Sequence, residues 1–183
     1  MKAIAVYCGA NPGADPRYAL AARALGRALV ERNIALVYGG GNVGLMGIIA
    51  DEVLRWGGEV SGVIPRQLVD RELAHGGLTR LFVVKDMHER KAMMAELSDG
   101  FIAMPGGMGT LEELFEMLTW SQLGIHAKPV GVLNVDGYYD LLIGFIAHAR
   151  QAEFIRPAHA ALMIAESDPE SLLKRLLSPV ELA

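Results

Sequence analysis

Short apolar runs alternate with amphipathic stretches along the whole chain. The apolar runs are bounded by turn residues and predict strands near Ala3–Tyr7, Ala35–Tyr38, Glu59–Ile64, Arg80–Val84, Gly100–Met104, Pro129–Asn134 and Leu162–Ala165. The stretches between them have helical periodicity and predict helices near Asp15–Arg32, Gly44–Trp56, Met87–Leu97, Thr110–Leu123, Tyr138–Ala149 and Pro169–Leu176. We therefore expect an α/β fold: a Rossmann-like, doubly wound, mostly parallel sheet of about six to seven strands, with helices on both faces.

Local sequence patterns add detail to the prediction for two of these helices and for one connection. In the helix Thr110–Leu123, the predicted buried stripe consists of Leu111, Leu114, Phe115 and Leu118. The helix Met87–Leu97 follows Asp86 and carries Glu89 three residues after it, an arrangement typical of a capping box. The stretch Pro65–Gly77 is the most irregular of the chain and is interpreted either as a loop beside a site or as a flexible flap.

Composition and charge narrow the class of protein. The chain has 183 residues, 52% of them hydrophobic, and is predicted to form one domain over residues 1–183. No apolar run reaches the roughly 18 residues of a membrane span, and a net charge of −4 argues against binding nucleic acid. Cys8 is the only cysteine, and the N-terminal residues lead into a strand instead of a signal peptide, so we expect a cytoplasmic protein.

The strongest chemical signal is the segment Met104–Glu113, in which a buried strand runs into a glycine-rich turn and then a helix. Glycines let a ligand approach the backbone, and the free N–H groups at a helix start attract phosphate. Glu112 and Glu113 are expected in the first turn of that helix. A carboxylate beside a phosphate site opposes binding, which indicates that it acts on the sugar that the phosphate holds. Spacing leaves open which of the two acids faces the ligand.

Arg90 and Lys91 form a second candidate group, early in a predicted helix where cations oppose the helix dipole. Arg90 shares a helix face with Met87 and Met94, so this face is not simply polar. Two interpretations remain open. Arg90 binds a phosphate or a catalytic carboxylate through its planar guanidinium, or it extends into solvent.

The segment Gly39–Gly44 matches G-x-G-x-x-G, the fingerprint of dinucleotide sites. It follows the second predicted strand instead of the first, and no acid stands at the end of the next strand to hold a ribose. Close approach of the loop to a substrate, or of a helix to a strand, explains these glycines better. The histidines have no metal-ligand spacing, so no metal site is predicted, and Cys8 is interpreted as a packing residue.

Several motifs together resemble the LOG ("lonely guy") family of cytokinin riboside 5′-monophosphate phosphoribohydrolases, long described as possible lysine decarboxylases. The resemblance rests on two long motifs, Met87–Lys91 and Pro105–Glu113, and covers nearly the whole chain. It extends to Cys8-Gly9, Gly39–Gly47, Thr119–His126, Lys128–Gly131 and Asn134–Tyr139. It implies a Rossmann-like homodimer that cleaves the N-glycosidic bond of a nucleoside 5′-monophosphate, such as AMP or an N6-substituted AMP, and needs no cofactor.

Carried over by motif, the resemblance assigns Arg90 and Glu113 as the catalytic pair. The substrate-binding residues that it implies are Glu72, Lys91, Gly107, Met108, Gly109, Thr110, Leu111, Glu112 and Thr119. The sequence departs from the family pattern at Ala10, where serine is common, at Met108, where tyrosine is frequent, and over Leu73–Thr79. These departures leave the chemistry intact and leave the preferred base open.

Two other functions are compatible with parts of the sequence. One is a decarboxylase that uses pyridoxal phosphate, although no lysine has a recognisable Schiff-base setting with an acidic partner for the cofactor ring. The other is a non-catalytic carrier of a nucleotide or cofactor on the same frame. Glu113 beside a phosphate site argues against the carrier, because binding alone favours a neutral or basic residue at that position.

Overall fold

The strands in the described part of the chain all run parallel in one sheet. The computed structural model describes residues 1–69 and 74–178. The strands are β1 (Ala3–Tyr7), β2 (Ala35–Tyr38), β3 (Val60–Pro65), β4 (Arg80–Val84), β5 (Gly100–Ala103), β6 (Val130–Leu133) and β7 (Met163–Glu166). They form a seven-stranded sheet in the order β4-β3-β2-β1-β5-β6-β7. The predicted fold class is therefore confirmed, with every pair of neighbouring strands parallel.

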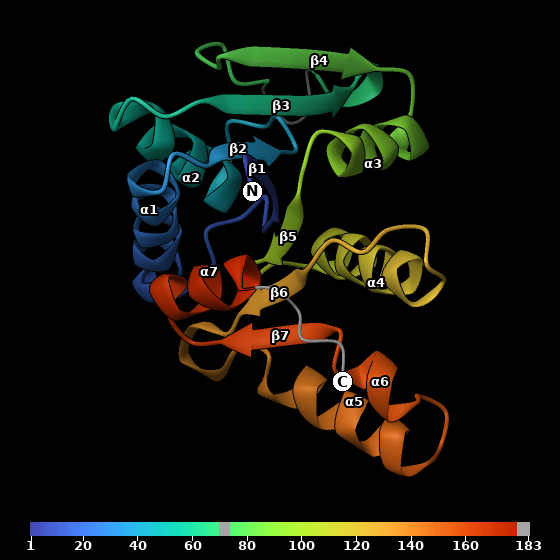
Figure 1. Cartoon of the computed structure of the whole chain (residues 1–183). Helices are drawn as coiled ribbons and strands as arrows, with labels where there is room; N and C mark the ends of the chain where they lie inside the picture. Colours follow the sequence, from blue (N-terminus) through green and yellow to red (C-terminus); the bar gives the residue numbers. More distant parts are fainter. Residues whose placement is uncertain (70–73, 179–183) are drawn as a thin grey trace.

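Helices cover both faces of this sheet (Figure 1). The helices are α1 (Pro16–Glu31), α2 (Gly44–Arg55), α3 (Met87–Glu96), α4 (Met108–Gln122), α5 (Asp140–Gln151), α6 (Pro157–Ala160) and α7 (Pro169–Leu177). Figure 1 shows α1, α2 and α7 on one side of the sheet and α3, α4 and α5 on the other. None of the helices in the described residues is both long and apolar enough to cross a bilayer.

Each face of the sheet has its own hydrophobic core, because successive side chains of a strand point to opposite faces. Ile4 and Val6 of β1 pack with α1, α2 and α7, whereas Ala5 and Tyr7 pack with α3, α4 and α5. The central strands are buried on both faces, which explains their uninterrupted apolar sequences.

The chain changes direction across the sheet between β1 and β5. From β1 the strands proceed outward through β2 and β3 to β4, whereas β5 lies on the other side of β1 and leads to β6 and β7. The connections after β1 and β5 therefore diverge at the carboxyl edge of the sheet and leave a crevice. Ligands of open α/β sheets bind at such a switch point.

Helix α4 differs from its prediction in two respects. It begins at Met108, two residues before the predicted start, so Glu112 and Glu113 lie in its second turn and the expected acids in the first turn are wrong. The predicted buried stripe is also partly wrong, because Phe115 is 39% exposed while Met117 is fully buried. The earlier start follows from Gly107, whose extended backbone serves as the N-cap.

The other boundaries agree with the prediction to within about two residues, apart from three short helical segments that the periodicity did not indicate. These are α6 and the 3₁₀ turns η1 (Arg66–Leu68) and η2 (Val135–Gly137). Because η2 precedes α5, Tyr138 and Tyr139 lie in a turn and not in the helix predicted to begin at Tyr138. The predicted cap of α3 is present: the Asp86 carboxylate accepts hydrogen bonds from the N–H groups of His88 and Glu89, both at 3.0 Å.

Candidate active site

A cavity of about 420 Å³ opens at the switch point between β1 and β5. Its walls come from the ends of these strands, the start of α4, the β2–α2 loop, α3, and the turn after β6. Residues with polar or aromatic side chains in the lining are Tyr7, Asn11, Tyr18, Arg90, Thr110, Glu112, Glu113 and Tyr138. The tertiary structure thus brings the two predicted catalytic residues, Arg90 and Glu113, into the wall of one cavity.

The amino terminus of α4 forms one end of the cavity. Gly107 is the N-cap, and the first helical hydrogen bond runs from the N–H of Leu111 to its carbonyl at 3.1 Å. The preceding N–H groups of the helix have no acceptor within it, which makes this end a favourable place for an anion. An added Cβ at Gly107 or at Gly109 meets nothing within 4 Å in the described residues, so a ligand has room to approach the backbone there.

Arg90 is a buried cavity residue, which rules out the interpretation that it extends into solvent. Only 6% of it is exposed. Its Nη2 donates to the carbonyl oxygen of Gly39 at 3.2 Å, and its Nη1 lies 3.6 Å from the Sδ atom of Met87. A buried arginine requires partners for its charge. Arg90 makes at least one further polar or electrostatic interaction, and Glu113 also makes at least one.

The charges of Glu113 and Arg90 both act on the end of β1. Burial raises the pKa of the Cys8 thiol, the Glu113 carboxylate raises it further, and the Arg90 guanidinium opposes this. Burial likewise raises the pKa of Tyr7, again with Glu113 adding to the effect. Cys8 is therefore a protonated thiol, which agrees with the interpretation of a packing residue and not of a nucleophile.

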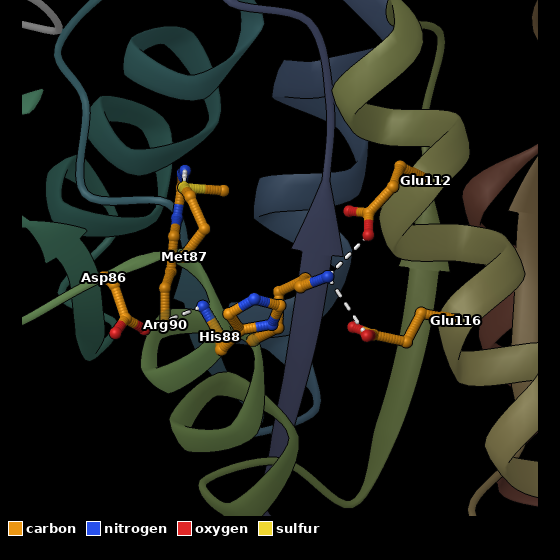
Figure 2. A network of polar contacts seen from close by, with 7 residues as sticks. Asp86, Met87, His88, Arg90, Glu112 and Glu116 are labelled. Carbon is orange, nitrogen blue, oxygen red and sulfur yellow. Dashed lines mark hydrogen bonds and ion pairs between the residues drawn. The ribbon is translucent and has the colours of Figure 1, made fainter.

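Lys91, the neighbour of Arg90, faces α4 and is absent from the cavity lining. Its Nζ atom donates to a carboxylate oxygen of Glu112 at 2.5 Å and of Glu116 at 3.0 Å, as the dashed lines in Figure 2 indicate. Burial by itself lowers the pKa of Lys91, but the hydrogen bonds to the two carboxylates outweigh it, so the pKa is raised. Lys91 therefore fixes α3 against the second and third turns of α4.

The remaining predicted substrate-binding residues differ in position. Gly107, Gly109, Thr110 and Glu112 line the cavity, whereas Met108 is 85% exposed and lies outside the lining. Leu111 and Thr119 are also absent from the lining, and Thr119 lies on an exposed part of α4. Glu72 lies outside the described residues.

Three tyrosines of the cavity wall, Tyr7, Tyr18 and Tyr138, were not predicted as site residues. Tyr18 and Tyr138 both line the cavity, and their rings meet edge to face at a centroid distance of 5.7 Å. The dipeptide Asp136-Gly137 is a turn signal that, in retrospect, places Tyr138 in a connection at the carboxyl edge of the sheet. Within the described residues, no group of three or more histidine, cysteine, aspartate or glutamate side chains is arranged to hold a metal ion.

Comparison with known proteins gives relatives over almost the whole chain. Residues 46–176 match the family model described as "Possible lysine decarboxylase". The chain is 50% identical over 179 residues to a cytokinin riboside 5′-monophosphate phosphoribohydrolase of Rhodococcoides fascians, covering 97% of this chain and 90% of that protein. It is also 50% identical over 175 residues to LOG7 of Arabidopsis thaliana, which has the same enzyme name, covering 96% of this chain and 81% of that protein.

Solved structures show the same fold at low sequence identity. The molybdenum cofactor binding protein of Rippkaea orientalis superposes with a TM-score of 0.72 at 24% identity and covers 96% of this chain and 97% of its own. A molybdenum cofactor carrier protein of Chlamydomonas reinhardtii also has a TM-score of 0.72, at 19% identity, and covers 97% of this chain and 98% of its own. The extent of the family match and the identity of about half of all positions to named relatives establish that this chain belongs to the LOG family.

Proposed function

We propose that this protein hydrolyses the N-glycosidic bond of a nucleoside 5′-monophosphate and releases the free base and ribose 5-phosphate. The observation that carries the proposal is the meeting, in one cavity, of an open helix start with Glu113 and the buried Arg90. An anion site next to a carboxylate suits a substrate whose phosphate anchors a sugar beside that carboxylate. The names of the relatives, phosphoribohydrolases of cytokinin riboside 5′-monophosphates, support the same reaction.

In the proposed mechanism, the N–H groups at the start of α4 bind the 5′-phosphate, and the ribose lies over Glu113. The bond between C1′ and the base nitrogen breaks, its electron pair stays with the base, and positive charge develops on the ribose. The Glu113 carboxylate stabilises this charge and accepts a proton from the water whose oxygen bonds to C1′. The base nitrogen takes up one proton from solvent and Glu113 returns its proton to solvent, so the products are the neutral base and ribose 5-phosphate and the carboxylate is regenerated.

Arg90 has the complementary role in this mechanism. Its guanidinium is fixed by the Gly39 carbonyl and lies in the wall of the same cavity as Glu113. We propose that it orients Glu113 and binds the phosphate or the ribose hydroxyls of the substrate, because its fork of N–H donors suits both. Preorganised charges of this kind contribute several kcal/mol to catalysis, about 3 to 4 for a single donor.

The substrate class is tested with a panel of nucleotides and nucleosides. Isopentenyladenosine monophosphate, AMP, GMP and CMP are compared with the corresponding unphosphorylated nucleosides, and the released base is measured by chromatography. We expect hydrolysis of an adenine nucleotide, with or without an N6 substituent, and no hydrolysis of the nucleosides. Equal rates with and without the 5′-phosphate contradict the anion site, and absence of hydrolysis with every nucleotide contradicts the enzyme function.

The two alternative functions have less support. No lysine among the described residues lines the cavity, and Lys91 is paired with Glu112 and Glu116. Both observations disfavour a pyridoxal phosphate decarboxylase. The molybdenum cofactor carriers share the fold at 19–24% identity, and this likeness concerns the fold alone. The release of adenine from AMP distinguishes a hydrolase from a carrier directly.

We further propose that the protein is a cytoplasmic homodimer. Apolar side chains on α5 and just after it are exposed: Leu141 is 90% exposed, Phe145 62% and Phe154 89%. Leu141 and Phe145 are four residues apart on α5 and share one face, which suits a surface buried by a second copy. Light scattering should give the mass of a dimer, and Leu141→Asp with Phe145→Asp should give a monomer. The single, buried, free thiol of Cys8 suits the reducing cytoplasm.

A further inference from the structure

Three consecutive carbonyl groups lead into the cap of α4, and each is bound by a different donor. The carbonyl of Met104 accepts a hydrogen bond from the hydroxyl of Tyr139 at 2.6 Å. The carbonyl of Pro105 accepts one from the N–H of Gly9 at 3.1 Å. The carbonyl of Gly106 accepts one from the hydroxyl of Tyr138 at 2.6 Å. The connection between β5 and α4 is therefore fixed peptide by peptide before the helix begins.

These hydrogen bonds also determine where the next N–H groups point. In a trans peptide, the carbonyl and the N–H of the following residue point in opposite directions within one plane. Holding the Gly106 carbonyl therefore sets the direction of the N–H of Gly107, the N-cap of α4. The carbonyl of Met104 is followed by Pro105, which has no N–H. Of the two tyrosines, only Tyr138 thus controls an amide at the helix start.

The turn that carries the tyrosines is itself held in an uncommon conformation. Asp136 and Gly137 both have positive φ angles, 50° and 75°. The N–H of Tyr139 donates to the side-chain oxygen of Asn134 at 2.7 Å, and the Tyr138 ring packs edge to face against that of Tyr139 at 5.0 Å. A non-glycine residue with positive φ persists only where its surroundings hold it in place, which is common at functional sites.

We propose that Tyr138 is a positioning residue of the phosphate site: its hydroxyl holds the Gly106 peptide so that the N–H of Gly107 faces the 5′-phosphate of the substrate. This role rests on the proposed function, because it assumes that a phosphate binds at the start of α4. Tyr138 lines the cavity and is 41% exposed, so without its hydroxyl the Gly106 carbonyl is free to bond water and the peptide is free to rotate. The expected defect concerns the direction of an amide and not the stability of the fold.

Tyr138→Phe tests this role, because it keeps the ring and removes the donor. We expect the KM for AMP and the inhibition constant of ribose 5-phosphate to rise about 3- to 10-fold, the value of one hydrogen bond. Adenosine, which has no phosphate, should bind the variant and the wild type equally. The melting temperature should stay close to that of the wild type.

Two matched variants separate positioning from stability. Tyr139→Phe removes the hydroxyl of a buried residue. The hydrogen bond of this hydroxyl does not orient any N–H group at the helix start, so the variant should have a lower melting temperature without a phosphate-specific loss of affinity. Tyr38→Phe removes a buried hydroxyl that has no hydrogen-bond partner among the described residues and lies outside the cavity lining, so it should change neither quantity.

The outcomes distinguish this role from the proposed function. If Tyr138→Phe binds ribose 5-phosphate as tightly as the wild type, or loses affinity for AMP and adenosine alike, the positioning role is overturned. If the wild type hydrolyses no nucleotide, but its affinity for ribose 5-phosphate still depends on the Tyr138 hydroxyl, the hydrolase function fails and the positioning role stands.

Discussion

The Nη2 atom of Arg90 donates a hydrogen bond to the carbonyl oxygen of Gly39, 3.2 Å away and 51 positions earlier in the chain. This contact joins α3 to the loop after β2 and explains why that loop needs a glycine. A Cβ added at Gly39 lies only 2.0 Å from Nη2, so no side chain fits while the guanidinium keeps its position. Gly39, the first glycine of the segment that resembles a dinucleotide fingerprint, is therefore required because the Arg90 guanidinium occupies the space of a side chain.

Gly39→Ala should therefore impair catalysis by displacing Arg90. A shift of about 1 Å in a catalytic group costs on the order of 100-fold in rate, so we expect kcat/KM to fall roughly 10- to 100-fold. Arg90→Ala should lower kcat/KM as well, because both changes remove the guanidinium from its position. Steady-state kinetics with AMP measure the effect. Gly144→Ala on α5 is the control, because its Cβ meets nothing within 4 Å in the described residues. Unchanged kinetics of Gly39→Ala show that the position of Arg90 is not critical.

Glu113→Gln keeps the size of the side chain and removes its charge. If the carboxylate stabilises the developing charge on ribose, kcat should fall by about 10² to 10⁴, while the affinity for nucleotide changes little. Single-turnover kinetics and nucleotide binding by calorimetry separate the two effects. Glu116→Gln is the control, because this carboxylate lies one turn further along α4 and outside the cavity lining. The fall in kcat of this variant should be far smaller. Near-normal turnover of Glu113→Gln excludes the proposed role.

Lys91→Met tests whether Lys91 acts through α4 or by binding substrate. Removal of the ammonium leaves Glu112 and Glu116 without their shared partner, and the partial exposure of Glu112 reduces the cost. We expect a loss of about 1 to 2 kcal/mol in the free energy of unfolding and a lower kcat with little change in KM. Urea unfolding and steady-state kinetics measure both. A raised KM at unchanged stability assigns Lys91 to direct substrate binding instead.

Two glycines of the α4 cap should respond differently to alanine. At Gly109 a Cβ meets nothing within 4 Å in the described residues, so Gly109→Ala should fold normally yet lose at least about tenfold in kcat/KM, because the methyl group occupies ligand space. At Gly106 a Cβ lies 2.2 Å from Oγ1 of Thr110, so Gly106→Ala should also lower the melting temperature. Full activity of Gly109→Ala means that no ligand approaches this part of the backbone.

The buried carboxylate of Glu52 should make the fold sensitive to acid. Its donors are Nη1 of Arg23 at 3.2 Å, Nε of Arg27 at 2.7 Å and Nε1 of Trp56 at 2.9 Å. Burial by itself raises the pKa of Glu52, but these hydrogen bonds outweigh it and the pKa is lowered. A carboxylate with a lowered pKa stabilises the fold above its unfolded pKa of about 4.3, and this contribution is lost as the pH falls through its folded pKa.

Urea unfolding of the wild type and of Glu52→Gln between pH 7 and pH 3 measures this contribution. The variant should be less stable by about 1 to 3 kcal/mol at pH 7 and at pH 5, the value of hydrogen bonds to a charged group. The difference should shrink below about pH 4, where the wild-type carboxylate becomes protonated. A difference that stays constant down to pH 3 shows that the charge of Glu52 does not contribute.

Local patterns were sufficient for most elements of the fold. The strands β1 and β2 have the predicted bounds, because buried parallel strands are uninterrupted apolar runs between turn residues. The edge strand β4 also has its predicted bounds, although most of its residues are exposed. Errors occurred where local patterns are ambiguous. Phe115 fits the helical stripe of α4 but lies at the surface, and the four residues of α6 are too few to give a periodic signal. The Asp136-Gly137 turn delays the start of α5 and leaves Tyr138 free to reach Gly106.

The sequence by itself determined the fold class, and it predicted the glycine-rich start of α4 as a candidate anion site and, through the family resemblance, Arg90 and Glu113 as candidate catalytic residues. These depend on side-chain periodicity, on helix-start chemistry and on contiguous motifs, all of which are properties of neighbouring residues. Only the tertiary structure decided that Arg90 contacts Gly39, that Lys91 faces α4, and that Tyr138 contacts the Gly106 carbonyl. Such contacts join residues 20 or more positions apart, and they depend on strand order and helix packing, which no local pattern encodes.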